Sequence, residues 1–296
     1  MTSGFERPLD TSARPTGRTT IRLCVLEGDA AHEADDVVAT EEPLEIRLVD
    51  GIPGALPTAV ALTMRTPGDP DDVELALGFL HGEAVIRGAA DVAHATYCLE
   101  PDITAEQRWN VVTVTLAPGR TAGDLARLER HFTTTSACGV CGKARLDQLV
   151  LDGYQPLPTG PTIAPSTLYA LPERLRAAQG LFADTGGLHA AGLFDAAGTL
   201  VAAREDVGRH NAVDKLVGWA LREGRLPLAD HMLLVSGRAS FEILQKALAA
   251  GIPVVCAVSA PSSLAVAVAE RFGMTLVGFL RGERGNVYAG AGRVGR

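Results

Sequence analysis

Residues 232–280 read "MLLVSGRASFEILQKALAAGIPVVCAVSAPSSLAVAVAERFGMTLVGFL", and this stretch decides the fold. Three apolar runs in it have the length of buried strands, and the two segments between them have helical spacing. The strand-like runs are 232–236, 253–259 and 274–280, and the helical segments are 237–251 and 260–273. Gly251 supplies a stop for the first helix. The alternation predicts a layered α/β/α domain with a largely parallel sheet and right-handed crossovers.

The same alternation begins further upstream. Residues 188–206 predict a β-hairpin whose turn is "DAAG", and residues 208–224 predict the helix that follows it. Another helix, opened by Ser166, is expected over 166–179. We therefore assign residues 161–296 to one α/β domain.

The N-terminal part of the chain has a different pattern. Strand-like runs occur at 36–51, 58–68 and 109–116, and an acidic start before helically spaced apolar residues predicts a helix over 69–86. These elements predict a small α+β domain. The expected organisation is a flexible tail over 1–20, the α+β domain over 21–130, a cysteine loop and linker over 131–160, and the α/β domain over 161–296.

Composition and charge narrow the class of protein. The 296 residues are 47% hydrophobic and 21% charged, which is ordinary for a soluble globular protein. No window has the apolar length of a membrane span and the first residues lack a hydrophobic signal region, so we expect a cytoplasmic protein without a membrane partner. The net charge of −8 divides into −11 for residues 1–130 and +3 for residues 131–296. An anionic ligand therefore suits the second part, whereas the concentrated basic patch of a nucleic-acid binder is missing.

Three turns in the α/β domain have the features of an anion site. They are "AREDVGRHN" (203–211), "VSGRAS" (235–240) and "VSAPSS" (258–263), and each follows a predicted strand and opens a predicted helix. Backbone N–H groups at helix starts and arginine forks both bind phosphate, and ligands of such sheets bind beyond the carboxyl ends of the strands. The candidate residues are Gly208, Arg209, His210, Ser236, Gly237, Arg238, Ser259 and Ser262.

A fourth polar loop, "FLRGERGNVY" (279–288), ends the last long strand. Arg281 and Arg284 in this loop could reach the same ligand, although taken alone the loop also fits an ordinary solvated hairpin. The chain contains neither G-x-x-x-x-G-K-[ST] nor a G-x-G-x-x-G that opens a helix. The ligand is therefore not expected to be held as ATP or NAD usually is.

Cys138 and Cys141 form a C-x-x-C pair within "TTTSACGVCGKARL" (133–146). A short helix is predicted after the pair, and with Lys143 and Arg145 it favours a thiolate. A four-ligand set for structural zinc is not evident, so no metal site is predicted. The other cysteines, Cys24, Cys98 and Cys256, are expected to be small buried apolar residues. The residues alone leave metal binding, disulfide cycling and sulfur transfer open.

Five segments, taken together in their order and spacing, resemble the FdhD family of sulfur carrier proteins. They are "CGVCG" (138–142), "GLHAAGLFD" (187–195), "REDVGRHNAVDKLVG" (204–218), "SGRASFEILQKA" (236–247) and "VSAPSSLAV" (258–266). The resemblance extends from about residue 37 over nearly the whole remaining chain, and the tail before it has no usable match.

The resemblance implies a specific activity, that of a sulfurtransferase. Such a protein accepts persulfide sulfur from a cysteine desulfurase and passes it to the molybdenum (or tungsten) cofactor in its bis(molybdopterin guanine dinucleotide) form, before insertion into formate dehydrogenase. Cys138 matches the persulfide carrier, and Cys141 is the second cysteine of the catalytic pair. The cofactor-binding stretch of the family matches Phe279, Leu280, Arg281, Gly282, Glu283 and Arg284. The resemblance also implies a homodimer and a second domain similar to the cytidine deaminase fold without its zinc chemistry.

Two alternative functions remain open at this point. The chain could be a chaperone that binds the cofactor and uses its cysteines structurally, or a thiol–disulfide oxidoreductase that needs no cofactor. Replacing both cysteines separates the first alternative from sulfur transfer, because a chaperone would keep its function. A C-x-x-C pair that cycles with a thiol reductant in the absence of cofactor would instead indicate the oxidoreductase.

Overall fold

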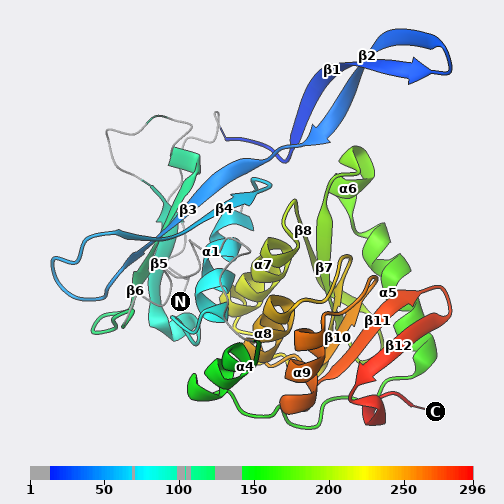
Figure 1. The fold of residues 1–296 in the computed structure, drawn as a ribbon. Coiled ribbons are helices and arrows are strands. Elements are labelled where there is room, and N and C mark those ends of the chain that lie inside the picture. The colour runs from blue at the N-terminus through cyan, green and yellow to red at the C-terminus, as the bar shows by residue number, and fades with distance from the viewer. Residues whose placement is uncertain (1–13, 69–70, 99–103, 105–107, 124–141, 296) are drawn as a thin grey trace.

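The structure, a computed structural model, describes residues 14–68, 71–98, 104, 108–123 and 142–295. Within these residues the chain is a mixed α/β protein with a six-stranded, a four-stranded and a two-stranded sheet (Figure 1). The predicted mixed α/β class is thus confirmed. The likeness to the cytidine deaminase fold and the limits assigned to the two domains and the linker stay predictions.

The six-stranded sheet forms the centre of the C-terminal part. Its strand order is β12-β11-β10-β9-β7-β8. The elements of this part are α4 (Gly142–Leu151), α5 (Pro165–Ala177), α6 (Gly180–Thr185), β7 (His189–Asp195), β8 (Leu200–Asp206), α7 (Arg209–Arg222), β9 (His231–Val235), α8 (Phe241–Ala249), β10 (Val254–Ala257), α9 (Ser263–Arg271), β11 (Thr275–Arg281), β12 (Arg284–Ala289) and η2 (Ala291–Arg293).

The expectation of a largely parallel sheet is wrong. Only β9–β10 and β10–β11 pair in parallel, whereas β7 is antiparallel to both of its neighbours, β8 and β9, and β12 is antiparallel to β11. The physical reason is that tight turns join β7 to β8 and β11 to β12, and a tight turn pairs two strands antiparallel. The crossover from β8 through α7 to β9 then passes β7, which lies between two strands of the same direction and is antiparallel to both. One boundary also shifts, because α5 begins at Pro165, a residue suited to the first helical position.

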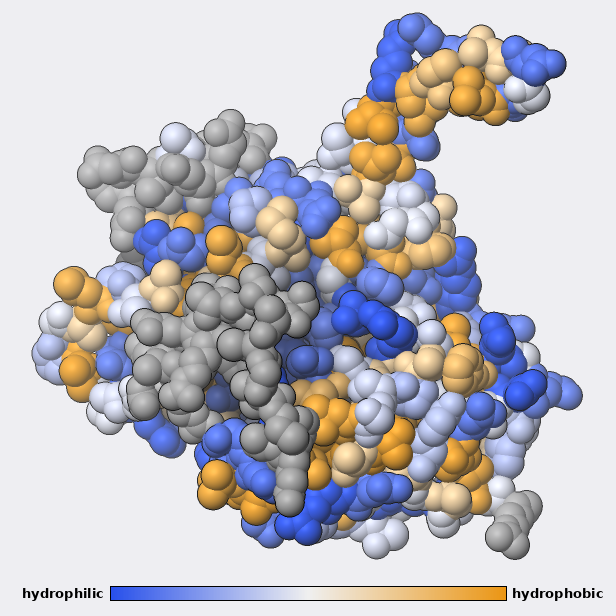
Figure 2. All heavy atoms as spheres, viewed as in Figure 1, coloured by the Kyte–Doolittle hydropathy of each residue, from blue (hydrophilic) through white to orange (hydrophobic). Residues whose placement is uncertain are grey.

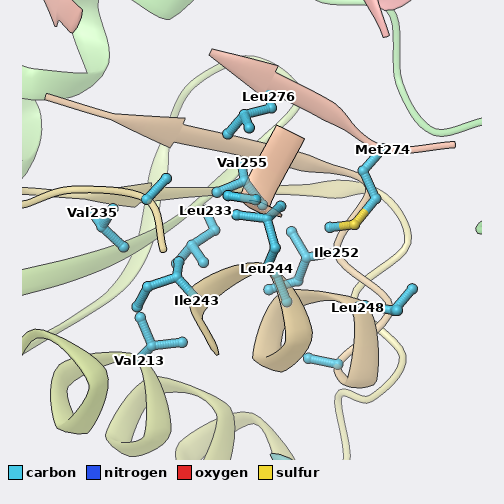
Figure 3. Close-up of a cluster of buried hydrophobic side chains, with 14 of the residues drawn as sticks. Val213, Leu233, Val235, Ile243, Leu244, Leu248, Ile252, Val255, Met274 and Leu276 are labelled. Atoms are coloured by element: carbon cyan, nitrogen blue, oxygen red, sulfur yellow. The ribbon is translucent and has the colours of Figure 1, made fainter. Parts of the chain in front are cut away.

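Helices cover both faces of this sheet. One face packs its fully buried residues, among them Leu233 and Val255, against α7, α8 and α9, where Ile243 and Leu244 meet the strands (Figure 3). The other face packs against Leu171 and its neighbours on α5. Burial of these apolar surfaces holds the sheet between two helical layers.

The four-stranded sheet belongs to the N-terminal part and has the order β4-β3-β6-β5. Its elements are β3 (Glu42–Val49), β4 (Thr58–Arg65), α1 (Asp71–Gly82), η1 (Ala89–Asp91), β5 (Val92–Tyr97) and β6 (Val111–Leu116). The sheet packs one face on α1, and Leu221 from α7 joins the same apolar cluster. The helix and strands predicted over 69–86 and 109–116 are confirmed.

Helices α1 and α7 join the two parts of the molecule at a crossing between two glycines. A Cβ added to Gly78 of α1 would lie 1.8 Å from the Asp214 carbonyl oxygen, and one added to Gly218 of α7 would lie 1.8 Å from that of Glu74. The backbones are therefore in direct contact, which any side chain at either position would prevent.

A two-stranded ribbon, β1 (Arg18–Glu27) and β2 (Ala30–Ala39), projects from the body (Figures 1 and 2). Two expectations need correction here. Residues 18–20, assigned to the tail, lie in β1, because they pair with the end of β2. Cys24, expected to be buried, is exposed, because it lies on a ribbon without a covering layer; Cys98 and Cys256 are buried as predicted.

Candidate functional site

The predicted turns meet at one edge of the six-stranded sheet. Because β8, β9, β10 and β11 run in the same direction, their carboxyl ends lie together, and α7, α8 and α9 start there (Figure 1). His189, at the start of the antiparallel β7, lies at the same edge. The edge therefore gathers polar residues from five strands, as ligand sites of open α/β sheets do.

Backbone and side-chain hydrogen bonds connect these turns to each other. Ser236 donates its N–H to the Ala190 carbonyl (2.9 Å), and its Oγ accepts the Ala190 N–H (2.9 Å). Ser259 N–H donates to the Gly237 carbonyl (3.3 Å), and Phe279 N–H donates to the Ser259 carbonyl (3.1 Å). The segments at 236–238, 259 and 279 thus form one continuous surface.

Gly237 also brings the first turn into this surface. A Cβ added to Gly237 would lie 3.4 Å from the His189 ring and 3.7 Å from Cδ of Arg209. The Nε of Arg209 is buried and has no hydrogen-bond partner among the described residues. A buried guanidinium N–H without a partner is costly, and an anionic ligand at the edge would satisfy it. Arg209 is therefore the strongest ligand-binding candidate at this site.

Two histidines beside Arg209 are held neutral. Burial, and then the charge of Arg209, lower the pKa of His189. The same two causes lower the pKa of His210 to about 4. His210 Nε2 lies 3.1 Å from Ser240 Oγ and 3.8 Å from a Glu242 carboxylate oxygen. At neutral pH both imidazoles can therefore bind a ligand by hydrogen bonds without adding charge.

The three helix starts differ in what they offer. Gly208 and Ser240, at the N-cap positions of α7 and α8, make no side-chain capping hydrogen bond. Ser262 caps α9 itself by accepting the Ala265 N–H at 3.2 Å. At α8 the Glu242 carboxylate accepts its own backbone N–H and the Ser240 hydroxyl, so the start of α7 is better placed for an anion than those of α8 and α9.

The stretch from Phe279 to Arg284 forms the end of β11, the turn and the start of β12. Phe279 is half-buried and has a φ of +52°, which is strained for a bulky residue and is typical of functional segments. Leu280 is fully buried in the core, so its side chain cannot contact a ligand. The remaining side chains of the turn, and that of Arg238, are exposed.

A cavity of about 570 Å³ opens between this edge and the α5–α6 segment. His189, Val207 and Ser236 line it from the sheet, and Arg176 lies across from them with its guanidinium carbon 3.9 Å from the centroid of the Phe182 ring. Sequence reasoning missed Arg176, Phe182 and His189 as site residues. Of these three residues, only His189 lies in a segment that the sequence analysis singled out, "GLHAAGLFD" (187–195).

A second cavity, of about 260 Å³, lies between the four-stranded sheet, α1, α7 and α8. His210 and Asn211 line it, so the segment 207–211 separates the two cavities. Beside it, the Arg145 guanidinium of α4 lies 5.8 Å from the centroid of the Phe241 ring. Cys138 and Cys141 lie outside the described residues, but α4 begins at Gly142, as the sequence predicted.

The titration of His210 predicts a pH effect on stability. Its pKa is about 4 in the folded protein against 6.5 for a free histidine, so the unfolded chain holds more protons between these values. This contribution is complete above pH 6.5 and is lost as the pH falls towards 4. We expect urea unfolding at pH 7, 6 and 5 to show a steeper loss of stability in the wild type than in His210→Gln. Parallel curves would contradict the assignment.

Two absences hold for the described part of the chain. It contains no group of three or more His, Cys, Asp and Glu side chains placed to bind a metal ion. None of its helices combines the length and apolarity needed to cross a membrane.

Comparison with known proteins agrees with the resemblance seen in the sequence. The model of the FdhD/NarQ family matches residues 39–295. The sulfur carrier protein FdhD of Nocardia farcinica is 51% identical, over 94% of this chain and 96% of its own. That of Streptomyces coelicolor is 53% identical, with the same coverage. A crystal structure from Desulfotalea psychrophila, described as a candidate formate dehydrogenase accessory protein, superposes with a TM-score of 0.70 at 25% identity, covering 94% of this chain and 99% of that one.

Proposed function

The chain belongs to the FdhD/NarQ family, and from this premise we propose that it is a sulfurtransferase that supplies sulfur to the molybdenum cofactor of a formate dehydrogenase. Its partners are then a cysteine desulfurase, which provides the sulfur, and the formate dehydrogenase that receives the cofactor. The cofactor is cargo rather than a resident group. Action in the cytoplasm and a homodimeric state belong to the same proposal.

The observation that carries this proposal is the Nε of Arg209, which is buried at the edge of the sheet and has no hydrogen-bond partner in the part of the chain that the structure describes. Bis(molybdopterin guanine dinucleotide) carries pyrophosphates, and a guanidinium beside the start of α7, which no side chain caps, suits a pyrophosphate. Gly237 leaves the backbone open beside Arg209, where a Cβ would meet the His189 ring at 3.4 Å.

The sulfur step falls to the cysteine pair. The Cys138 thiolate attacks the outer sulfur of the desulfurase persulfide, a new S–S bond forms on Cys138, and the desulfurase cysteine leaves as its thiolate. The outer sulfur moves between two thiolates, so no net oxidation or reduction occurs. Location of the pair just before α4 supports this role, because a helix start favours the thiolate form.

Nucleotide binding tests the cofactor half of the proposal. We expect Arg209→Ala to weaken the binding of GDP by tenfold or more, since a charge-assisted hydrogen bond is worth about 1.5–3 kcal/mol. His210→Ala should weaken it less and leave the thermal midpoint nearly unchanged. Calorimetric titration with GDP measures both, with Arg22→Ala on the projecting ribbon as the control. Equal affinity in the wild type and Arg209→Ala would remove this edge from the site.

A further inference from the structure

The carboxylate of Asp206, at the end of β8, is fully buried and accepts four hydrogen bonds. Its Oδ1 accepts the Gly208 N–H (2.8 Å) and the Asn211 amide (3.0 Å). Its Oδ2 accepts the Thr66 N–H (3.1 Å) and lies 2.8 Å from Nζ of Lys215. Four contacts match the full acceptor capacity of a carboxylate, so this side chain has no freedom left.

Lys215 is equally constrained. Its ammonium group is fully buried and lies 2.8 Å from Asp206, and it donates to the carbonyls of Thr66 (2.9 Å) and Glu205 (3.2 Å). Three acceptors match its three N–H bonds. The carboxylate of Asp71, on α1, lies 3.7 Å away.

Thr66, which follows β4, connects this pair to the N-terminal part. Its N–H binds Asp206, its carbonyl binds Lys215, and its Oγ1 accepts the Val207 N–H at 3.2 Å. The neighbouring Asn211 amide donates to the Met64 carbonyl at 2.7 Å. Backbone N–H groups at 207 and 208 are therefore held by groups that the N-terminal part supplies or orients.

The chain then reaches Arg209, whose guanidinium is the ligand-binding candidate. We propose that Lys215 and Asp206 are positioning residues for the anion site: through Thr66 they fix the 207–209 backbone, and hence the direction in which Arg209 points. The inference rests on the proposed function for the identity of the ligand. The anion site thus depends on contacts between the N-terminal and the C-terminal part, and neither Lys215 nor Asp206 touches the ligand.

A purely stabilising role explains the pair less well. Replacing a buried ion pair by apolar residues of similar volume is often neutral or stabilising, so such a pair is weak evidence for a contribution to stability. An apolar pair would not provide the directed hydrogen bonds that Lys215 and Asp206 make to the backbone of the N-terminal and the C-terminal part. The ion pair therefore serves to fix the geometry of the 207–209 backbone.

The test compares Lys215→Met with Arg204→Met in the full chain. Arg204 of β8 also connects the two parts, because it donates to the Glu74 carboxylate of α1 through Nε (2.6 Å) and Nη2 (3.0 Å). Its side chain forms no hydrogen bond with the backbone of residues 207–209. Amide hydrogen exchange of residues 207–209, measured well below both melting temperatures, reports local opening. We expect at least tenfold faster exchange there in Lys215→Met, together with at least tenfold weaker GDP binding, and wild-type values for both in Arg204→Met.

Two results would overturn the inference. One is that the exchange rates of the 207–209 amides are similar in Lys215→Met and Arg204→Met and change only with overall stability. The other is that these rates in Lys215→Met equal those of the wild type. If that variant does not fold, Thr66→Val removes only the acceptor of the Val207 N–H and is measured in the same way, with faster exchange expected at 207–209. If the wild-type protein binds no GDP, the nucleotide site fails, while the exchange data still decide the positioning role.

Discussion

Replacement of Cys138 by alanine will abolish both persulfide loading and formate dehydrogenase maturation, whereas Cys141→Ala will leave part of each. Chemistry alone favours Cys141 as the more acidic thiol, because it directly precedes α4 and the helix dipole stabilises a thiolate. Transfer also needs access, and the family resemblance points to Cys138. Intact-mass spectrometry after incubation with a cysteine desulfurase and cysteine will show the added sulfur, and peptide mapping will locate it.

The control for this experiment is Cys24→Ala. Cys24 is exposed on the projecting ribbon, so its loss should change neither loading nor maturation. Cys256 is a poor acceptor, because burial raises the pKa of its thiol to about 12. Finding the sulfur on Cys141 in the wild type, or full client activity with Cys138→Ala, would overturn the assignment. Maturation that survives loss of both cysteines would favour the cofactor chaperone instead.

A single methyl group at the helix crossing will have the largest effect on stability. In Gly218→Ala the new Cβ would lie 1.8 Å from the Glu74 carbonyl oxygen, so α1 and α7 must move apart. Alanine normally stabilises a helix interior by about 0.5–1 kcal/mol relative to glycine, so any loss reports the crossing itself. We expect a loss of about 3 kcal/mol, at the upper end for overpacking, measured by urea unfolding.

Gly180→Ala is the matched control for the crossing. Gly180 also lies in a helix, α6, but an added Cβ would meet no atom within 4 Å. This variant should be as stable as the wild type or slightly more stable. Gly78→Ala repeats the test from the other helix, where the Cβ would lie 1.8 Å from the Asp214 carbonyl oxygen. Unchanged stability in both crossing variants would mean that the helices are not in backbone contact.

Local pattern was sufficient for the elements that carry the candidate site. The apolar runs at 232–236, 253–259 and 274–280 form β9, β10 and β11, and the turns between them open α8 and α9 as expected. An apolar run that follows a helix stop has few alternatives to a buried strand, so periodicity alone predicts it. Glycine and serine at the strand ends likewise indicated where the backbone would be open to a ligand.

The sequence pattern predicted less where the residues that pair or pack together are far apart in the chain. The antiparallel place of β7 between β8 and β9 and the contact between Gly78 and Gly218 left no readable periodicity. Leu280 shows the same limit, because the family resemblance placed it in the cofactor-binding stretch, whereas its side chain is fully buried in the core. The cavity wall built by Arg176 and Phe182 lies in α5 and α6; the sequence predicted a helix over 166–179 without a site residue, and it predicted no element over 180–185.

The sequence by itself determined the α/β class, the helix starts at the sheet edge and, through the FdhD/NarQ family, the cysteine pair that is proposed to carry sulfur. Only the tertiary structure decided that the Nε of Arg209 is buried without a hydrogen-bond partner among the described residues, and that Thr66 holds Asp206 from 140 positions away. The physical reason is that strands and helices follow from neighbouring residues, whereas the satisfaction of a buried charge depends on every group that folding brings around it.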